Sequence, residues 1–168
     1  MKRKFILLTL VFIGISVAAS ADIVTQLDAG LGPGVASQDY WYKPDTYSIN
    51  TNFQSSWYDA DAGIGFGLHL NTFQDMEKLT YKEIGLDFVL ASPTNKFLWN
   101  VGGGLTTDFY IPNSFHVNIG FQEAFGNSNH RFALREMVSF NMIEDKPSLR
   151  LVLFLNYSFN NAAVHGRL

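Results

Sequence analysis

The chain has 168 residues, of which 47% are hydrophobic, 15% aromatic and only 16% charged, and its formal net charge at pH 7 is −3. This acidic balance makes it a poor candidate for nucleic-acid binding, and the lack of cysteine excludes disulfides and sites built on thiolates. Soluble domains usually carry about 25% charged residues, so the low charge and the many aromatics favour a protein that enters a membrane as strands.

The first 21 residues have the three parts of a secretory signal peptide. Residues 2–4 are basic, residues 5–17 form an apolar run, and the small residues 18–21 form a cleavage site. A helix of about thirteen apolar residues is too short to span a bilayer, so cleavage is favoured over an uncleaved anchor. We expect a mature chain from Asp22, with nine basic against fifteen acidic residues and a net charge of about −6.

Eight later segments alternate large apolar residues with polar or small ones, which is the period of two of a β-strand. The clearest segment is 149–159, where every odd position is apolar or aromatic and the even positions include Arg150, Asn156 and Ser158. About eleven residues is also the length that a tilted strand needs to cross a bilayer. In chain order, the predicted strands are 22–31, 47–54, 57–68, 81–91, 96–105, 115–122, 132–141 and 149–159.

The connections between these strands alternate in length. Gly32-Pro33-Gly34 is expected to stop the first strand. Short turns are predicted at 55–56, 92–95 and 126–129, longer loops at 35–45, 71–80 and 106–113, and a last loop at 143–147. Short turns on one side and long loops on the other are typical of outer-membrane barrels, with both chain termini on the inner side.

Two segments depart from plain alternation. Glu136 falls on the apolar side in the middle of its strand, where a charge would be costly in lipid. A bulge at Arg135-Glu136 would return both side chains to the interior. Three consecutive glycines at 102–104 indicate a bend or a second bulge.

The cleavage site, the alternating segments and the last strand together resemble the small eight-stranded outer-membrane proteins of Gram-negative bacteria, the OmpA/OmpX-type or OmpW-like barrels. Leu155, Tyr157 and Phe159 look like the aromatic-ended sorting signal that the barrel-insertion machinery reads, although residues 160–168 follow as a tail. The resemblance implies an all-β protein, a closed antiparallel up-and-down transmembrane barrel over 22–159. It also implies a monomer of the outer membrane without a cofactor, in contact with lipid and lipopolysaccharide.

An eight-stranded barrel is narrow enough for side chains to fill its interior, so a wide pore is not expected. Closure brings the first strand beside the eighth, and Asp28 is therefore expected to pair with Arg150. We interpret the predicted interior charges as a structural network, with a catalytic or ion-conducting role as the alternative. The network is predicted to contain Asp28, Asp59, Asp61, Glu83, Asp87, Arg135 and Arg150.

We expect an integral outer-membrane barrel, not an enzyme, with a structural, surface-contact or small-solute role. Two other functions remain open from the sequence. A soluble, lipocalin-like periplasmic barrel with an apolar ligand would need its apolar face inward, which the scarcity of charge beside 149–159 disfavours. A lipid-modifying enzyme could use Ser114 and His116, which share a strand face, with Glu123 downstream. A serine and a histidine in a polar interior are more often hydrogen-bonded fillers.

The sequence also bears on surface contacts and on metal binding. The aromatic residues Tyr40, Trp41, Tyr42, Phe109 and Tyr110 are expected in exposed loops, where they contact a partner, lipopolysaccharide or a host surface, or form part of an aromatic girdle. His69 and His130 are expected at the membrane interface. The four scattered histidines show no metal-ligand spacing, so no metal is expected.

Overall fold

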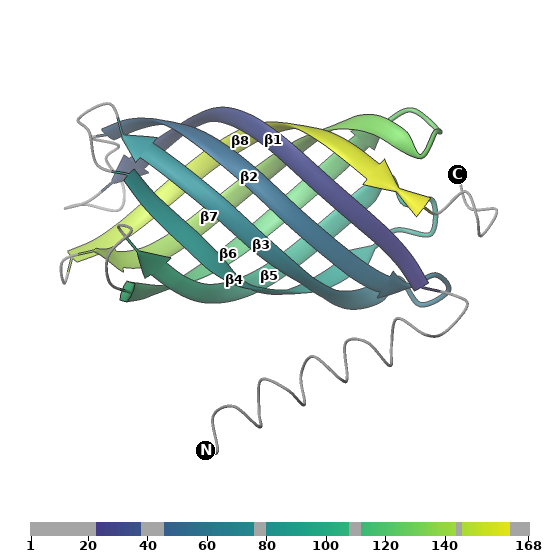
Figure 1. Cartoon of the computed structure of the whole chain (residues 1–168), viewed down its shortest axis with the longest axis horizontal. Helices are drawn as coiled ribbons and strands as arrows, with labels where there is room; N and C mark the ends of the chain where they lie inside the picture. The colour runs from purple at the N-terminus through teal and green to yellow at the C-terminus, as the bar shows by residue number, and fades with distance from the viewer. Residues whose placement is uncertain (1–22, 38–45, 76–79, 108–111, 144–145, 162–168) are drawn as a thin grey trace, which may run out of the picture.

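A computed structural model of the chain describes residues 23–37, 46–75, 80–107, 112–143 and 146–161. Eight antiparallel strands each pair with their chain neighbours, and the last pairs with the first, so the sheet is closed (Figure 1). The strands are β1 (Ile23–Ser37), β2 (Thr46–Asp59), β3 (Ile64–Asp75), β4 (Thr80–Ala91), β5 (Phe97–Thr107), β6 (Pro112–Phe125), β7 (His130–Ile143) and β8 (Lys146–Asn160). The predicted closed eight-stranded barrel is confirmed. The predicted signal peptide lies outside the described residues.

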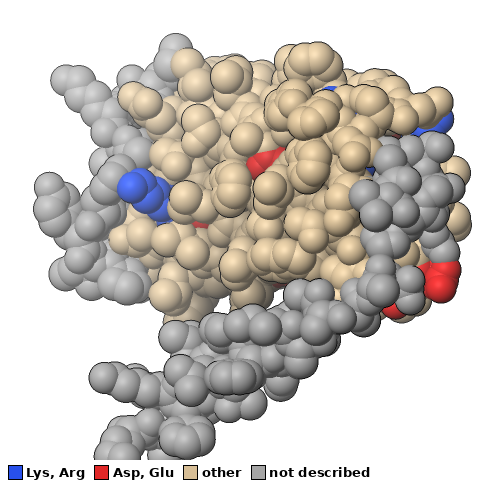
Figure 2. Space-filling view, turned by 45° about the vertical axis from the view of Figure 1, so that its right-hand side comes forward, with Lys and Arg blue, Asp and Glu red and all other residues tan. Residues whose placement is uncertain are grey.

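Side chains alternate between the two faces of the barrel wall. In β8, Val152 and Phe154 are buried inside, whereas Leu151, Leu153 and Leu155 are exposed outside. The outer surface is accordingly apolar, and in Figure 2 the described surface is mostly tan, with the larger blue and red areas toward its two ends. Among the described residues, no helix is long and apolar enough to cross a membrane.

The first strand does not stop at Gly32-Pro33-Gly34, contrary to the sequence prediction. β1 continues to Ser37, and its register with β2 is unbroken through the pair Pro33 and Ile49. Gly32 is needed there, because a Cβ at this position would overlap the carbonyl oxygen of Leu153 on β8. β8 therefore comes close to the backbone of β1 beside Pro33, and the proline does not end the strand.

The predicted turn at Ser55-Ser56 is also wrong, because these residues lie inside β2. The chain turns instead at residues 60–63, where Oδ1 of Asp59 accepts hydrogen bonds from the backbone N–H groups of Asp61 (2.9 Å) and Ala62 (2.7 Å). Gly63 then adopts a φ of 66°. Asp59 and Asp61 thus build a turn and do not lie in mid-strand.

Neither predicted bulge occurs. The registers of β7 with β6 and with β8 run unbroken through Arg135 and Glu136, so Arg135 is buried inside and Glu136 is exposed outside. The ladders of β5 are likewise continuous through Gly102–Gly104, and its register with β6 shifts only between Thr106 and Thr107.

The ends of the barrel differ in their connections. Turns at 60–63, 92–96 and 126–129 lie at the end where β1 begins and β8 finishes, and the last two match the predicted turns. At the opposite end, strands reach further than predicted, because β3 continues to Asp75 and β6 begins at Pro112. The connections there, 38–45, 76–79, 108–111 and 144–145, lie outside the described residues.

Gly63→Ala is expected to destabilise the barrel more than Gly126→Ala. Both glycines have positive φ (66° and 97°), which costs roughly 1–2 kcal/mol for another residue. A Cβ at position 63 would also press against the carbonyl oxygen of Ala91, whereas no atom lies within 4 Å of a Cβ at position 126. Chemical unfolding of the refolded variants measures the two losses. Equal losses would contradict this account of the turn.

Candidate functional site

Two apolar clusters enclose the polar part of the barrel interior. Val24, Tyr58, Val89 and Leu98 pack together at the end with the short turns. Phe73, Met137, Val152 and Phe154 form a second cluster toward the other end. Between and around them, the described interior contains three buried carboxylates and three buried guanidinium groups, from Asp28, Glu83, Asp87, Arg131, Arg135 and Arg150. The opposite charges balance, which lowers the cost of enclosing them.

A pair of histidines spans the middle of the interior. Nε2 of His69 on β3 lies 2.8 Å from Nε2 of His116 on β6, and both side chains are buried. Oδ2 of Asp87 lies 3.1 Å from Nδ1 of His69, on the other side of that ring. Oγ1 of Thr106 lies 3.4 Å from Nδ1 of His116. The two rings therefore connect β4 to β6 across the barrel.

Amide side chains link this pair to a buried arginine. Arg135 donates to Oδ1 of Asn100 (3.1 Å), and Nδ2 of Asn100 donates to Oδ1 of Asn118 (3.1 Å). Nδ2 of Asn118 in turn lies 3.3 Å from Nε2 of His69, whose Nδ1 lies 3.1 Å from Oδ2 of Asp87. A row of polar side chains, Asn100, Asn118 and His69, thus leads from Arg135 to Asp87.

Glycines on the neighbouring wall make room for these side chains. A Cβ at Gly102 would overlap Oδ1 of Asp87, and a Cβ at Gly85 would lie 2.7 Å from Cε1 of His69. Gly102 on β5 and Gly85 on β4 therefore leave space for the buried side chains of Asp87 and His69.

Asp28 belongs to a second polar group and does not pair with Arg150, contrary to the sequence prediction. Its two carboxylate oxygens accept hydrogen bonds from Nε2 of Gln26 and Nε2 of Gln122, each 2.9 Å long. In the closing pair of strands, Asp28 lies opposite Ser158, whereas Arg150 lies opposite Ala36. The stagger of β1 against β8 keeps the two charges apart.

Arg150 lies between aromatic rings instead. Its guanidinium carbon is 4.6 Å from the centroid of the Phe73 ring and 5.1 Å from that of Tyr81. Such stacking stabilises a buried cation through the negative faces of the rings. The arginine therefore borders the second apolar cluster.

Glu83 connects opposite walls of the barrel. Its Oε1 accepts hydrogen bonds from Oγ of Ser139 (2.7 Å) and from Nδ2 of Asn141 (3.0 Å), both on β7. All three side chains are fully buried. A buried carboxylate on β4 that accepts two hydrogen bonds from β7 ties these two strands together.

The structure thus buries five of the seven predicted network residues: Asp28, Glu83, Asp87, Arg135 and Arg150. It also buries Arg131, to which the sequence analysis gave no role, and His69, which was expected at the membrane interface. Alternation along the strand could have indicated both positions. His69 falls on the same inward face as Gly65 and Gly67, and Arg131 falls on the same inward face as Arg135.

The candidate hydrolase residues do not assemble. Ser114 and His116 lie on the inner face of β6, but both ring nitrogens of His116 face Thr106 and His69, and Oγ of Ser114 has no hydrogen-bond partner within the described part of the chain. Glu123 is exposed on the outer face. The described residues contain no group of three acids and histidines that would hold a metal. The aromatic surface residues Tyr40, Trp41, Tyr42, Phe109 and Tyr110 lie outside the described segments.

Comparisons with known proteins agree with the fold. No protein-family model and no curated protein sequence matches the chain. The crystal structure of Ail, the attachment invasion locus protein of Yersinia pestis, in complex with the heparin analogue sucrose octasulfate, is similar, with a TM-score of 0.53 at 12% identity over 82% of this chain and 99% of that one. Neisserial surface protein A has a TM-score of 0.52 at 11% identity, over 82% and 95%. The chain has the fold of small eight-stranded outer-membrane β-barrels.

Ser139→Ala is expected to lower the free energy of unfolding by ~1.5–3 kcal/mol, because it removes a hydrogen bond to a buried carboxylate. Ser158→Ala is the matched control, since Ser158 is equally buried on the neighbouring strand but its Oγ has no hydrogen-bond partner among the described residues. The control should change stability little. Denaturant titration of the two refolded variants makes the comparison, and similar losses would argue against a role for Glu83 in holding β7.

Proposed function

We propose that this chain is an integral outer-membrane β-barrel that is exported with residues 1–21 as a cleaved signal peptide. The observation that carries the proposal is the outer face of the described strands. Large apolar side chains are exposed on all eight strands, among them Leu31, Phe53, Phe66, Leu86, Val101, Ile119, Val138 and Leu153. Monomeric soluble proteins rarely expose apolar patches larger than about 300–600 Å². Hydrocarbon is the environment in which such a wall is stable.

Aromatic residues on the outer face support this placement. Near the turns, the ring of Phe121 lies 5.4 Å from that of Trp99 and 5.9 Å from that of Phe97. On the other side of β6, Nδ1 of His130 lies 2.6 Å from the hydroxyl of Tyr157. Rings with a polar edge are favoured at a membrane–water interface, so we assign this end to the inner girdle.

The interior favours a structural or surface-contact role over a channel. Contacts such as His69–His116 and Glu83–Ser139 cross the barrel, and the side chains involved are no more than 2% exposed. An aqueous path for a small solute would have to break this packing. We therefore propose that the barrel is a filled, rigid support for the segments that connect its strands.

Those connecting segments are the proposed contact surface, with the aromatic residues Tyr40, Trp41, Tyr42, Phe109 and Tyr110. The Ail structure contains a heparin analogue, a polyanion. The connections of this chain contain two lysines, Lys43 and Lys78, against the acids Asp39, Asp45, Glu77, Asp108, Glu144 and Asp145. Acidic segments repel polyanions, so a partner that offers aromatic or cationic groups fits these connections better than a polyanion does.

The alternatives are less well supported. A lipocalin-like soluble barrel needs an apolar interior for its ligand and a polar exterior, and the described strands have the reverse arrangement. A lipid-modifying enzyme needs a serine activated by a base, and the serine and histidine on β6 make no such contact.

Ile119→Arg tests the membrane placement. Ile119 is 59% exposed near the middle of β6, so in water an arginine there would change stability by less than about 0.5 kcal/mol. In a bilayer the same substitution is expected to cost about 2–4 kcal/mol. Asn127→Arg, in an exposed turn, is the control and should cost little. Unfolding in lipid vesicles measures both, and a harmless Ile119→Arg would refute the proposed location.

A further inference from the structure

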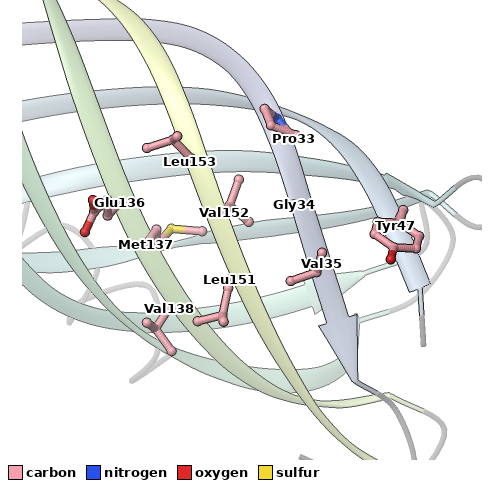
Figure 3. Close-up of a pocket in the computed structure, with 10 residues that line it drawn as sticks. All are labelled: Pro33, Gly34, Val35, Tyr47, Glu136, Met137, Val138, Leu151, Val152 and Leu153. Atoms are coloured by element: carbon pink, nitrogen blue, oxygen red, sulfur yellow. The ribbon is translucent and has the colours of Figure 1, made fainter. Parts of the chain in front are cut away.

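The pair of strands that closes the barrel is interrupted in the middle. The ladder of β1 with β8 runs from Gln26 to Leu31, stops, and resumes at Gly34 in the same register. Proline has no N–H to donate, so Pro33 leaves a gap in the hydrogen bonds to β8. A hollow of about 540 Å³ on the outer wall lies over this place, with Pro33 and Leu153 in its lining (Figure 3). The closing pair therefore depends on support elsewhere along its length.

Sequence separation also disfavours this pair. β1 and β8 are the first and last strands of the chain, whereas every other pair of neighbouring strands is joined by a single connection. Bringing distant segments together costs more chain entropy than closing a short turn does. Any contact that fixes the end of β8 to β1 therefore contributes directly to closure of the barrel.

Asn160, the last residue of β8, is held from three sides at the end with the short turns. Its backbone N–H donates to the carbonyl oxygen of Asn129, in the turn before β7 (2.8 Å). Its Nδ2 donates to Oε1 of Gln26 on β1 and to the hydroxyl oxygen of Tyr58 on β2, and both hydrogen bonds are 2.7 Å long. The side chain is fully buried. One residue thus joins β8 to β1, to β2 and to the turn before β7.

A neighbouring carboxylate fixes the direction of these hydrogen bonds. Oδ2 of Asp28 accepts from Nε2 of Gln26 (2.9 Å), and an ionised carboxylate cannot donate. The oxygen of the Gln26 amide is therefore the atom that faces Asn160, and it can only accept. An apolar side chain at position 160 would leave this buried oxygen and the hydroxyl of Tyr58 without their donor.

Asn161 has the opposite role just beyond the strand. The ladder of β1 with β8 ends at Gln26 and Asn160, and the residue that precedes Gln26 is Thr25. The backbone N–H of Thr25 donates to Oδ1 of Asn161 (2.7 Å). Because a backbone N–H can only donate, the side chain of Asn161 acts as an acceptor. It extends the pairing of β8 with β1 by one residue.

We propose that Asn160 and Asn161 form a C-terminal latch that holds the closing pair of strands shut at the end with the short turns. The predicted sorting signal ends at Phe159, and the two residues after it serve closure. Without the latch, the first part of β1 would open locally, since the ladder beyond it is already interrupted at Pro33. The latch does not depend on the proposed membrane location.

Leucine substitutions in the full-length chain test the latch through amide hydrogen exchange, measured by NMR on the refolded barrel in detergent micelles. Asn160→Leu removes the buried donor and should accelerate exchange of residues 25–29 by about tenfold or more, while β4 keeps its rates. Asn141→Leu is the matched control, because Asn141 is equally buried and donates to Glu83 near the other end of the barrel. It should leave the exchange of residues 25–29 unchanged.

Substitutions at Asn161 separate its role as an acceptor from its bulk. Asn161→Asp retains an oxygen for the N–H of Thr25 and should exchange like the natural chain, whereas Asn161→Leu should exchange several-fold faster at Thr25. Unchanged exchange in the leucine variants of both asparagines would overturn the latch, as would acceleration spread evenly over all eight strands. Equal acceleration by Asn161→Asp and Asn161→Leu would also contradict it, because the acceptor would then have no role.

Discussion

The pairing of β1 with β8 is the contact on which the rest of the structure depends. It runs from Gln26 opposite Asn160 to Ser37 opposite Leu149 and closes the sheet, so no strand is left with a free edge. In hydrocarbon an unpaired backbone group costs several kcal/mol, so only a closed sheet of strands is stable there. Closure also separates two environments, a polar interior and an apolar wall. The ladder is interrupted between the pairs Leu31–Leu155 and Gly34–Val152, where Pro33 has no N–H to donate.

The interior shows how a narrow barrel can surround buried charges such as Asp28 and Arg135 with amide side chains. Asp28 is bracketed by glutamines, and Arg135 reaches Asp87 only through asparagines and a histidine. Neutral amides can donate and accept at once, so they satisfy buried charges while keeping strands at their proper spacing. Such packing makes the barrel rigid, which is suited to a support for the connecting segments and not to a pore.

The sequence predicts the faces of strands well and their ends and stagger poorly. Alternation in β4 to β8 assigns nearly every inward and outward residue, because each strand keeps one phase. The phase predicted for 47–54 is correct, but the alternation joins 57–59 to the third strand and turns Tyr58 toward lipid. These residues end β2 instead, and the hydroxyl of Tyr58 forms hydrogen bonds with Asn160 and Gln26 inside. The expected pair of Asp28 with Arg150 failed for another reason. Adjacency follows from strand order, but stagger depends on the tilt of the whole barrel.

The central claim is that odd-numbered residues of β8 face hydrocarbon and even-numbered ones face a packed interior. Nitroxide labels at single cysteines along 149–159, in vesicles, measure this through collisions with oxygen and with a water-soluble nickel chelate. The account predicts high oxygen access and no nickel access at Leu151, Leu153 and Leu155, and little access to either at Val152 and Phe154. Nickel access at the three leucines would contradict it.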